Sequence, residues 1–166
     1  MDNRIFHVTI KGLYFRATSP LEATTSDAHG AAQPPLGTSP TAEPPSRATG
    51  PELLLIQEKS GGWELPGGRL EHGEDFHTAL QRECQEEMGV PCDVLDKTPY
   101  WAWSTLGGDG IWKVVLCFRI ALPHLDFTRT DECAEWGFFD ANSVAGVKLT
   151  KQLQPLLDHL RCERIA

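Results

Sequence analysis

The sequence predicts an α/β fold in which helices pack on the faces of a mixed β-sheet. Short apolar runs rich in β-branched and aromatic residues, each bounded by turn residues, recur along the chain and indicate strands. Two other segments, at residues 76–88 and near the C-terminus, place apolar residues at helical spacing instead. Strands that outnumber helices in this way favour a sheet covered by helices.

The bulk composition indicates one soluble domain, and we assign residues 1–166 to it. A net charge of −8 without a long basic patch argues against a nucleic-acid polymer as the main partner. The sequence has no signal-peptide-like run and no apolar stretch of membrane length. Its five cysteines form no C-x-x-C pair, so we expect a reduced, cytoplasmic protein with mostly packing cysteines.

The first strand is expected at residues 7–15, HVTIKGLYF. Residues 17–50 follow with six prolines, many Ala, Ser and Thr, and no aromatic residue. Such a segment buries too little apolar surface to offset the entropy lost on ordering it. We therefore predict a disordered insertion at 17–50, in the connection between two neighbouring strands at 7–15 and 53–57.

The remaining strands and the last helix follow from similar patterns. Residues 53–57 form a short apolar run, and the tight turn KSGG separates it from a short strand, WEL, that enters a Pro-Gly-Gly loop. Further strands are expected at 110–122 and 135–140. Leucines at helical spacing predict a C-terminal helix that begins near residues 152–154, because Pro155 is tolerated only in a first turn.

The most acidic part of the chain reads as a helix from Asp75, its N-cap, to Met88, with Gly89 as the C-terminal stop. At about 100° per residue, an apolar stripe for the core is formed by Phe76, Leu80, Cys84 and Met88. Three carboxylates overlap the edge of this stripe, at roughly 20°, 340° and 280° from Phe76, namely Glu87, Glu83 and Glu86.

Carboxylates held together at a core edge are costly unless they are protonated or neutralised. A hard divalent cation such as Mg²⁺ prefers these oxygen ligands and keeps positions for water and phosphate. The preceding Gly67 and Gly68 let the backbone approach a ligand closely. An ion pair between Glu74 and Arg82 would tie this loop to the helix. The alternative is an acidic helix face that is merely solvated.

Together these residues resemble the Nudix hydrolase signature, G-x5-E-x7-R-E-U-x-E-E-x-G-U, in which U is a bulky aliphatic residue. The matching positions run from Gly68 to Val90, and Cys84 departs from the pattern at the first U. The resemblance implies an α/β/α sandwich with a mixed sheet and a loop–helix–loop catalytic motif. It also implies hydrolysis of a diphosphate bond in a nucleoside diphosphate linked to another moiety.

The resemblance further implies a site that uses Mg²⁺ or Mn²⁺. Its metal ligands would be the Gly68 carbonyl and the carboxylates of Glu83, Glu86 and Glu87. Glu74 and Arg82 would orient them. Many members of the family add an acidic residue from a later loop, and the candidates here are Asp131, Glu132 and Glu135. Of these we favour Glu132 as a further catalytic residue.

The substrate is less constrained by the sequence. Trp101 and Trp103 could stack on a base, or they could be ordinary packing residues. Arg69 and Lys59 flank the expected phosphate site and could contact phosphate, or could lie on the surface.

Two features that mark other subfamilies are missing, which narrows the choice of substrate. They are the zinc-ribbon cysteines of the NADH-cleaving type and the PQGG lead-in of RNA pyrophosphohydrolases. The chain looks MutT-like, with a nucleoside triphosphate or related small nucleotide as substrate, in a monomer or homodimer. Three other activities stay open: ADP-ribose or nucleotide-sugar hydrolysis, nucleotide sensing without cleavage, and isomerisation of an isoprenoid diphosphate.

Overall fold

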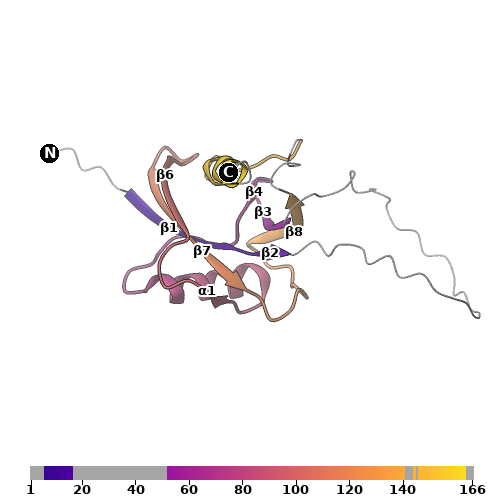
Figure 1. The fold of residues 1–166 in the computed structure, drawn as a ribbon. Helices are drawn as coiled ribbons and strands as arrows, with labels where there is room; N and C mark the ends of the chain where they lie inside the picture. The colour runs from indigo at the N-terminus through magenta and orange to yellow at the C-terminus, as the bar shows by residue number, and fades with distance from the viewer. Residues whose placement is uncertain (1–5, 17–51, 141–143, 145, 164–166) are drawn as a thin grey trace, which may run out of the picture.

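The computed structural model describes residues 6–16, 52–140, 144 and 146–163. Two helices cover a middle layer of strands from opposite sides (Figure 1). Helix α1 (Phe76–Met88) lies below the strands in this view, and helix α2 (Gln154–Glu163), which carries the C mark, lies above them. The predicted α/β/α sandwich is therefore confirmed. The predicted insertion at 17–50 falls outside the described residues.

The first sheet is mixed, and the long strand β7 lies at its centre. Its members are β1 (Phe6–Leu13), β5 (Asp93–Val94), β6 (Trp101–Leu106) and β7 (Trp112–Ala121). β1 runs parallel to β7, whereas β5 and β6 are antiparallel to it. The sequence WAWSTL fits either a strand or a packed aromatic segment. Its antiparallel pairing with β7 shows that it is a strand, β6.

The second sheet is antiparallel and is centred on β3. Its members are β2 (Phe15–Arg16), β3 (Glu52–Glu58), β4 (Trp63–Glu64) and β8 (Cys133–Asp140). β3 pairs with β8 along its length, and it pairs with β2 and β4 at its two ends.

The strand predicted at residues 7–15 is divided between the two sheets. It leaves β7 after Leu13, and the Tyr14 carbonyl accepts a hydrogen bond from the Leu54 N–H at 3.1 Å. Only Phe15 and Arg16 then pair with β3. The predicted neighbours 7–15 and 53–57 therefore meet only at this crossover, because parallel pairing with β7 takes up the rest of the strand.

The apolar side chains form two cores, one on each side of the strands. Alternation along β3 sends Leu54 and Ile56 toward α1, and Leu53 and Leu55 toward α2. Each buried leucine contributes about 1.5–3 kcal/mol relative to an exposed one, so both helices are firmly attached. Four of the five cysteines are buried, as their predicted packing role requires.

Helix α1 has its predicted bounds, and α2 begins at Gln154, within the predicted range 152–154. Asp75 caps α1 by accepting a hydrogen bond from the Thr78 N–H, and Gly89 ends the helix with a φ of 70°. The prediction that Phe76 belongs to the buried stripe is wrong: it is 40% exposed, because the first residue of the helix reaches only the edge of the core beside Phe118. Within the described residues, no helix has the length and apolar character needed to cross a membrane.

Candidate active site

The Pro-Gly-Gly loop lies directly against β1. The Ile10 N–H donates to the Gly68 carbonyl and the Gly12 N–H donates to the Pro66 carbonyl, both at 2.8 Å. Gly67 between them has a φ of +119°, and a Cβ there would lie 2.2 Å from the Ile10 carbonyl oxygen. Only glycine fits this position, because a side chain would both strain the backbone and push the loop off the strand.

A buried lysine supports the same loop from the face of β1. Lys11 is 5% exposed, and its ammonium lies 2.9 Å from Glu64 Oε1, which is also buried. The ammonium donates to the Leu65 carbonyl at 3.2 Å and to the Gly67 carbonyl. Burial alone would lower the pKa of Lys11, but the nearby Glu64 and Glu87 carboxylates together raise it above its ordinary value.

Neither Lys11 nor Glu64 was predicted as a site residue. The available signal was a lysine in the middle of the otherwise apolar strand HVTIKGLYF, where a charge is buried only if it has a partner. The sequence gives no indication of which partner that is.

Three carboxylates come together where α1 faces the loop before β8. Ligand oxygens of Glu83, Glu86 and Glu132 all lie within 4.8 Å of one another. Glu83 is buried, whereas Glu86 and Glu132 are exposed. Of the three acidic residues proposed in the later loop, Glu132 is the one in this group. A Cβ on Gly68 would lie 2.4 Å from Glu83 Oε1, so the Gly68 backbone also borders the cluster.

Arg82 connects the loop to the acidic residues of the helix. Its Nε donates to Glu74 Oε1 at 2.8 Å and its Nη2 to Glu74 Oε2 at 3.0 Å. Its Nη1 donates to both Glu83 Oε1 and Glu86 Oε2 at 2.8 Å. The predicted Glu74–Arg82 pair is thus present, and its hydrogen bonds hold the pKa of the Glu74 carboxyl below its ordinary value.

Glu87 lies apart from the group of three carboxylates. Its Oε2 accepts a hydrogen bond from the Gly67 N–H at 2.7 Å. Burial raises the pKa of Glu87 to about 8, although Lys11 and the Gly67 N–H act in the opposite direction. Burial likewise raises the pKa of Glu83, against the effect of Arg82. Metal ligation by Glu87 stays a prediction.

The donor set suits a hard divalent cation. Carboxylate oxygens are preferred ligands of Mg²⁺, and Mg²⁺ uses few of them because it retains water and substrate phosphates. Glu83 and Glu86 both accept hydrogen bonds from the Arg82 guanidinium, and its positive charge offsets part of the repulsion between the two carboxylates. The residues that would hold Mg²⁺ or Mn²⁺ are Glu83, Glu86 and Glu132, with the Gly68 backbone beside Glu83. Metal ligation by the Gly68 carbonyl, which accepts a hydrogen bond from the Ile10 N–H, stays a prediction.

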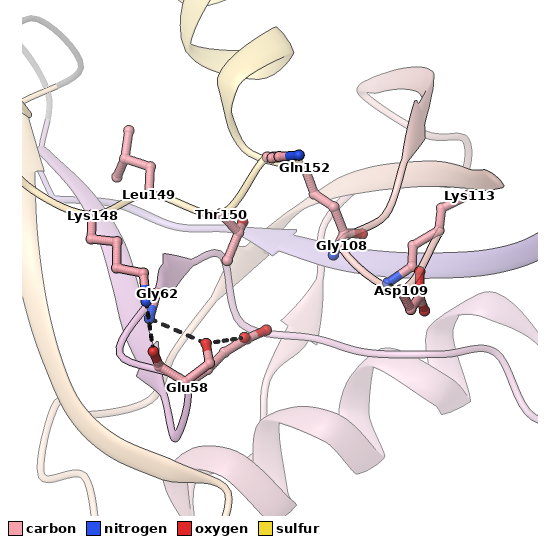
Figure 2. A pocket seen from close by; sticks show the side chains of 11 residues that line it. Glu58, Gly62, Gly108, Asp109, Lys113, Lys148, Leu149, Thr150 and Gln152 are labelled. Atoms are coloured by element: carbon pink, nitrogen blue, oxygen red, sulfur yellow. Dashed lines mark hydrogen bonds and ion pairs between the residues drawn. The ribbon is translucent and has the colours of Figure 1, made fainter. Parts of the chain in front are cut away.

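A pocket of about 350 Å³ lies between the β3–β4 turn, the β6–β7 turn and the segment before α2 (Figure 2). Its wall includes Thr150 and Gln152, whose side-chain oxygens Oγ1 and Oε1 are buried without a hydrogen-bond partner. Lys148 reaches across the pocket to the Ser60 carbonyl at 2.8 Å. Glu58 also lines it, and burial together with the adjacent Glu64 raises the pKa of Glu58. The pocket therefore adjoins the Lys11–Glu64 pair.

The predicted substrate-binding residues have different surroundings. Trp101 stacks on Trp103 at 4.7 Å and on His159 of α2 at 4.5 Å between ring centroids. The Trp103 Nε1 donates to the Gln152 carbonyl at 3.0 Å, which places this indole beside the pocket. Arg69 is exposed in the loop after Gly68, and Lys59 is exposed in the β3–β4 turn. Roles for these four residues in substrate binding stay predictions.

Comparison with known proteins identifies the class to which this fold and site belong. Residues 45–160, more than half of the chain, match the NUDIX domain. The chain therefore belongs to the Nudix family, as the signature between Gly68 and Val90 indicated.

Individual relatives agree with this assignment. The fold resembles the MutT protein of Methanosarcina mazei Go1, with a TM-score of 0.66 and 14% identity over 99% of both chains. In sequence, the chain is 36% identical over 89 residues to a MutT-like protein of Streptomyces ambofaciens, covering 54% of each chain. It is 45% identical over 60 residues to human 8-oxo-dGDP phosphatase NUDT18, covering 30% of this chain and 19% of that protein.

Proposed function

We propose that this protein is a divalent-metal-dependent Nudix hydrolase that cleaves a diphosphate bond in a nucleoside triphosphate or a related small nucleotide. The observation that carries the proposal is the cluster of Glu83, Glu86 and Glu132 beside the Gly68 backbone. The pocket between the β3–β4 turn and the segment before α2 offers room for a small ligand, and the side-chain oxygens of Thr150 and Gln152 in its wall have no hydrogen-bond partner.

The residues of the site have different roles in the proposed reaction. Arg82 holds Glu83 and Glu86 at a fixed separation and ties them to Glu74 in the loop. When bound, Mg²⁺ or Mn²⁺ would neutralise the diphosphate and activate a water. One of the clustered carboxylates accepts the proton that this water loses. Glu132 comes from the loop before β8, whereas Glu83 and Glu86 come from α1. The substrate can therefore be held between this loop and the helix.

Small nucleotides with different leaving groups are the substrates to compare. The human relative's name specifies 8-oxo-dGDP, so this compound belongs in the panel with dGTP, 8-oxo-dGTP, ADP-ribose and a nucleotide sugar. Each is incubated with Mg²⁺, and nucleotide and phosphate products are separated and quantified. We expect turnover to be highest on a nucleoside di- or triphosphate. Faster cleavage of ADP-ribose or the nucleotide sugar would replace the proposed substrate class.

The variant Glu86→Gln tests the metal cluster directly. It removes one charged ligand at an exposed position, so we expect the fold to persist and kcat to fall at least about a hundredfold. Glu71→Gln, which changes an exposed carboxylate of the preceding loop, is the matched control and should keep its activity. Full activity in Glu86→Gln would locate the chemistry elsewhere.

A nucleotide sensor is the main rival from a different functional class. Calorimetry with Mg²⁺ and nucleotide, run alongside the product assay, separates the two functions. Tight binding of a nucleotide that is never cleaved would establish the sensor instead.

A further inference from the structure

We call the Pro-Gly-Gly loop, residues 65–68, the catalytic loop. Its four consecutive carbonyls point alternately toward two different donors. Those of Pro66 and Gly68 accept hydrogen bonds from the β1 backbone, at 2.8 Å each. Those of Leu65 and Gly67 point the other way, where β1 has no N–H to offer, and accept from the Lys11 ammonium. One strand therefore binds both sides of the loop, with its backbone on one side and a single side chain on the other.

This arrangement is needed because the loop is buried. Leu65 is 1% exposed, and Pro66 and Gly67 are buried as well. A buried carbonyl without a donor is costly, so the loop would shift or admit water if the ammonium were absent. An ammonium has three N–H donors and no acceptor, which suits it to bridge Glu64, Leu65 and Gly67 at once.

The position of the loop affects two glutamates of α1. The Gly67 N–H binds Glu87 Oε2 at 2.7 Å, so rotation of this peptide would break that bond. The next residue, Gly68, borders Glu83 so closely that an added Cβ would lie 2.4 Å from Oε1. A displacement of a few tenths of an ångström at Gly67 or Gly68 would therefore alter the surroundings of two glutamates.

We propose that Lys11 is a positioning residue for the reaction, which fixes the peptides of Leu65 to Gly68 and thereby sets the geometry of the carboxylate cluster. This inference rests on the proposed hydrolase function. Lys11 acts through the loop and contacts neither the three clustered carboxylates nor the reacting atoms. The simpler role, a counter-ion that only neutralises Glu64, makes a different prediction.

The test compares Glu64→Gln with the double variant K11M/E64Q. Both lack the Glu64 charge, so they differ only in the ammonium and its two bonds to the loop. In metal-free protein we expect the Gly67 amide to exchange with solvent at least about tenfold faster in K11M/E64Q. Calorimetry should show Mn²⁺ binding that is about 10–100-fold weaker, and kcat should fall more than KM rises.

Two further variants complete the comparison. Lys97→Met removes an exposed lysine beyond the site and should leave exchange, Mn²⁺ affinity and kcat unchanged. Should K11M/E64Q fail to fold, K11Q/E64Q carries the same comparison, because glutamine retains one donor group and should give an intermediate loss.

The outcomes separate this inference from the proposed function. Equal Gly67 exchange and equal Mn²⁺ affinity in Glu64→Gln and the double variant would overturn the positioning role of Lys11. A wild-type protein that cleaves no nucleotide in the panel would overturn the proposed function instead. The exchange measurement needs neither metal nor substrate, so it can still be interpreted in that case.

Discussion

Replacing Gly67 with alanine should disturb the catalytic loop more than the same replacement disturbs a glycine that has open space around it. At a φ of +119° an L residue costs about 1–3 kcal/mol in backbone strain. A Cβ placed 2.2 Å from the Ile10 oxygen must also move the loop away from β1. That movement also weakens the hydrogen bond from the Gly67 N–H to Glu87, worth about 0.5–1.5 kcal/mol because the raised pKa of Glu87 leaves this carboxyl largely neutral.

Together these effects predict a loss of about 1.5–4.5 kcal/mol in the free energy of unfolding. For a chain of this size, each kcal/mol lowers the melting temperature by about 2–4 °C, so Gly67→Ala should melt about 3–18 °C lower. Differential scanning calorimetry of metal-free protein measures this shift. Mn²⁺ binding should weaken in parallel, because the Gly68 backbone moves with Gly67.

Gly61→Ala is the matched control. Gly61 also has a positive φ, +76°, but an added Cβ would have no atom within 4 Å. It therefore reports backbone strain alone, about 1–2 kcal/mol. If Gly67→Ala melts no lower than Gly61→Ala, the close approach of loop and strand does not matter to stability, and the reasoning is refuted.

Two further predictions concern pH and the segment at 17–50. Burial raises the pKa of Glu87 from 4.5 to about 8, so the folded state keeps a proton that the unfolded state releases. The free energy of unfolding of metal-free protein should therefore fall as pH rises across this range. Calorimetry at several pH values should show a smaller fall in Glu87→Gln; identical profiles would contradict the assignment. Replacing residues 17–50 with a short turn should preserve cooperative thermal unfolding, whereas loss of the transition would show that the segment packs.

The local features of the catalytic motif could be read from the sequence because they depend on residues close together in the chain. Asp75 and Gly89 end α1 where their capping preferences predict. Arg82 meets Glu74 across eight positions, a distance that one loop and two helical turns can span. The helical period placed Glu83, Glu86 and Glu87 together; the structure groups the first two, whereas Glu87 binds the Gly67 N–H.

Other features were settled only by packing between distant segments. Sequence left Asp131, Glu132 and Glu135 as alternatives, and the path of the loop before β8 brings Glu132 to the helix glutamates. The stack of Trp101 on His159 depends on how α2 packs over β6. Phe76 fits the apolar period but lies where the core ends, so it remains partly exposed.

By itself, the sequence determined the acidic helix, its caps and the family to which the chain belongs, since spacing and local conformational preference are properties of consecutive residues. Tertiary structure alone decided the support beneath the catalytic loop. Lys11 reaches carbonyls 54 and 56 positions further along the chain. That contact exists because parallel pairing of β1 with β7 fixes the strand beside the loop, and a burial-driven ion pair with Glu64 holds the ammonium there.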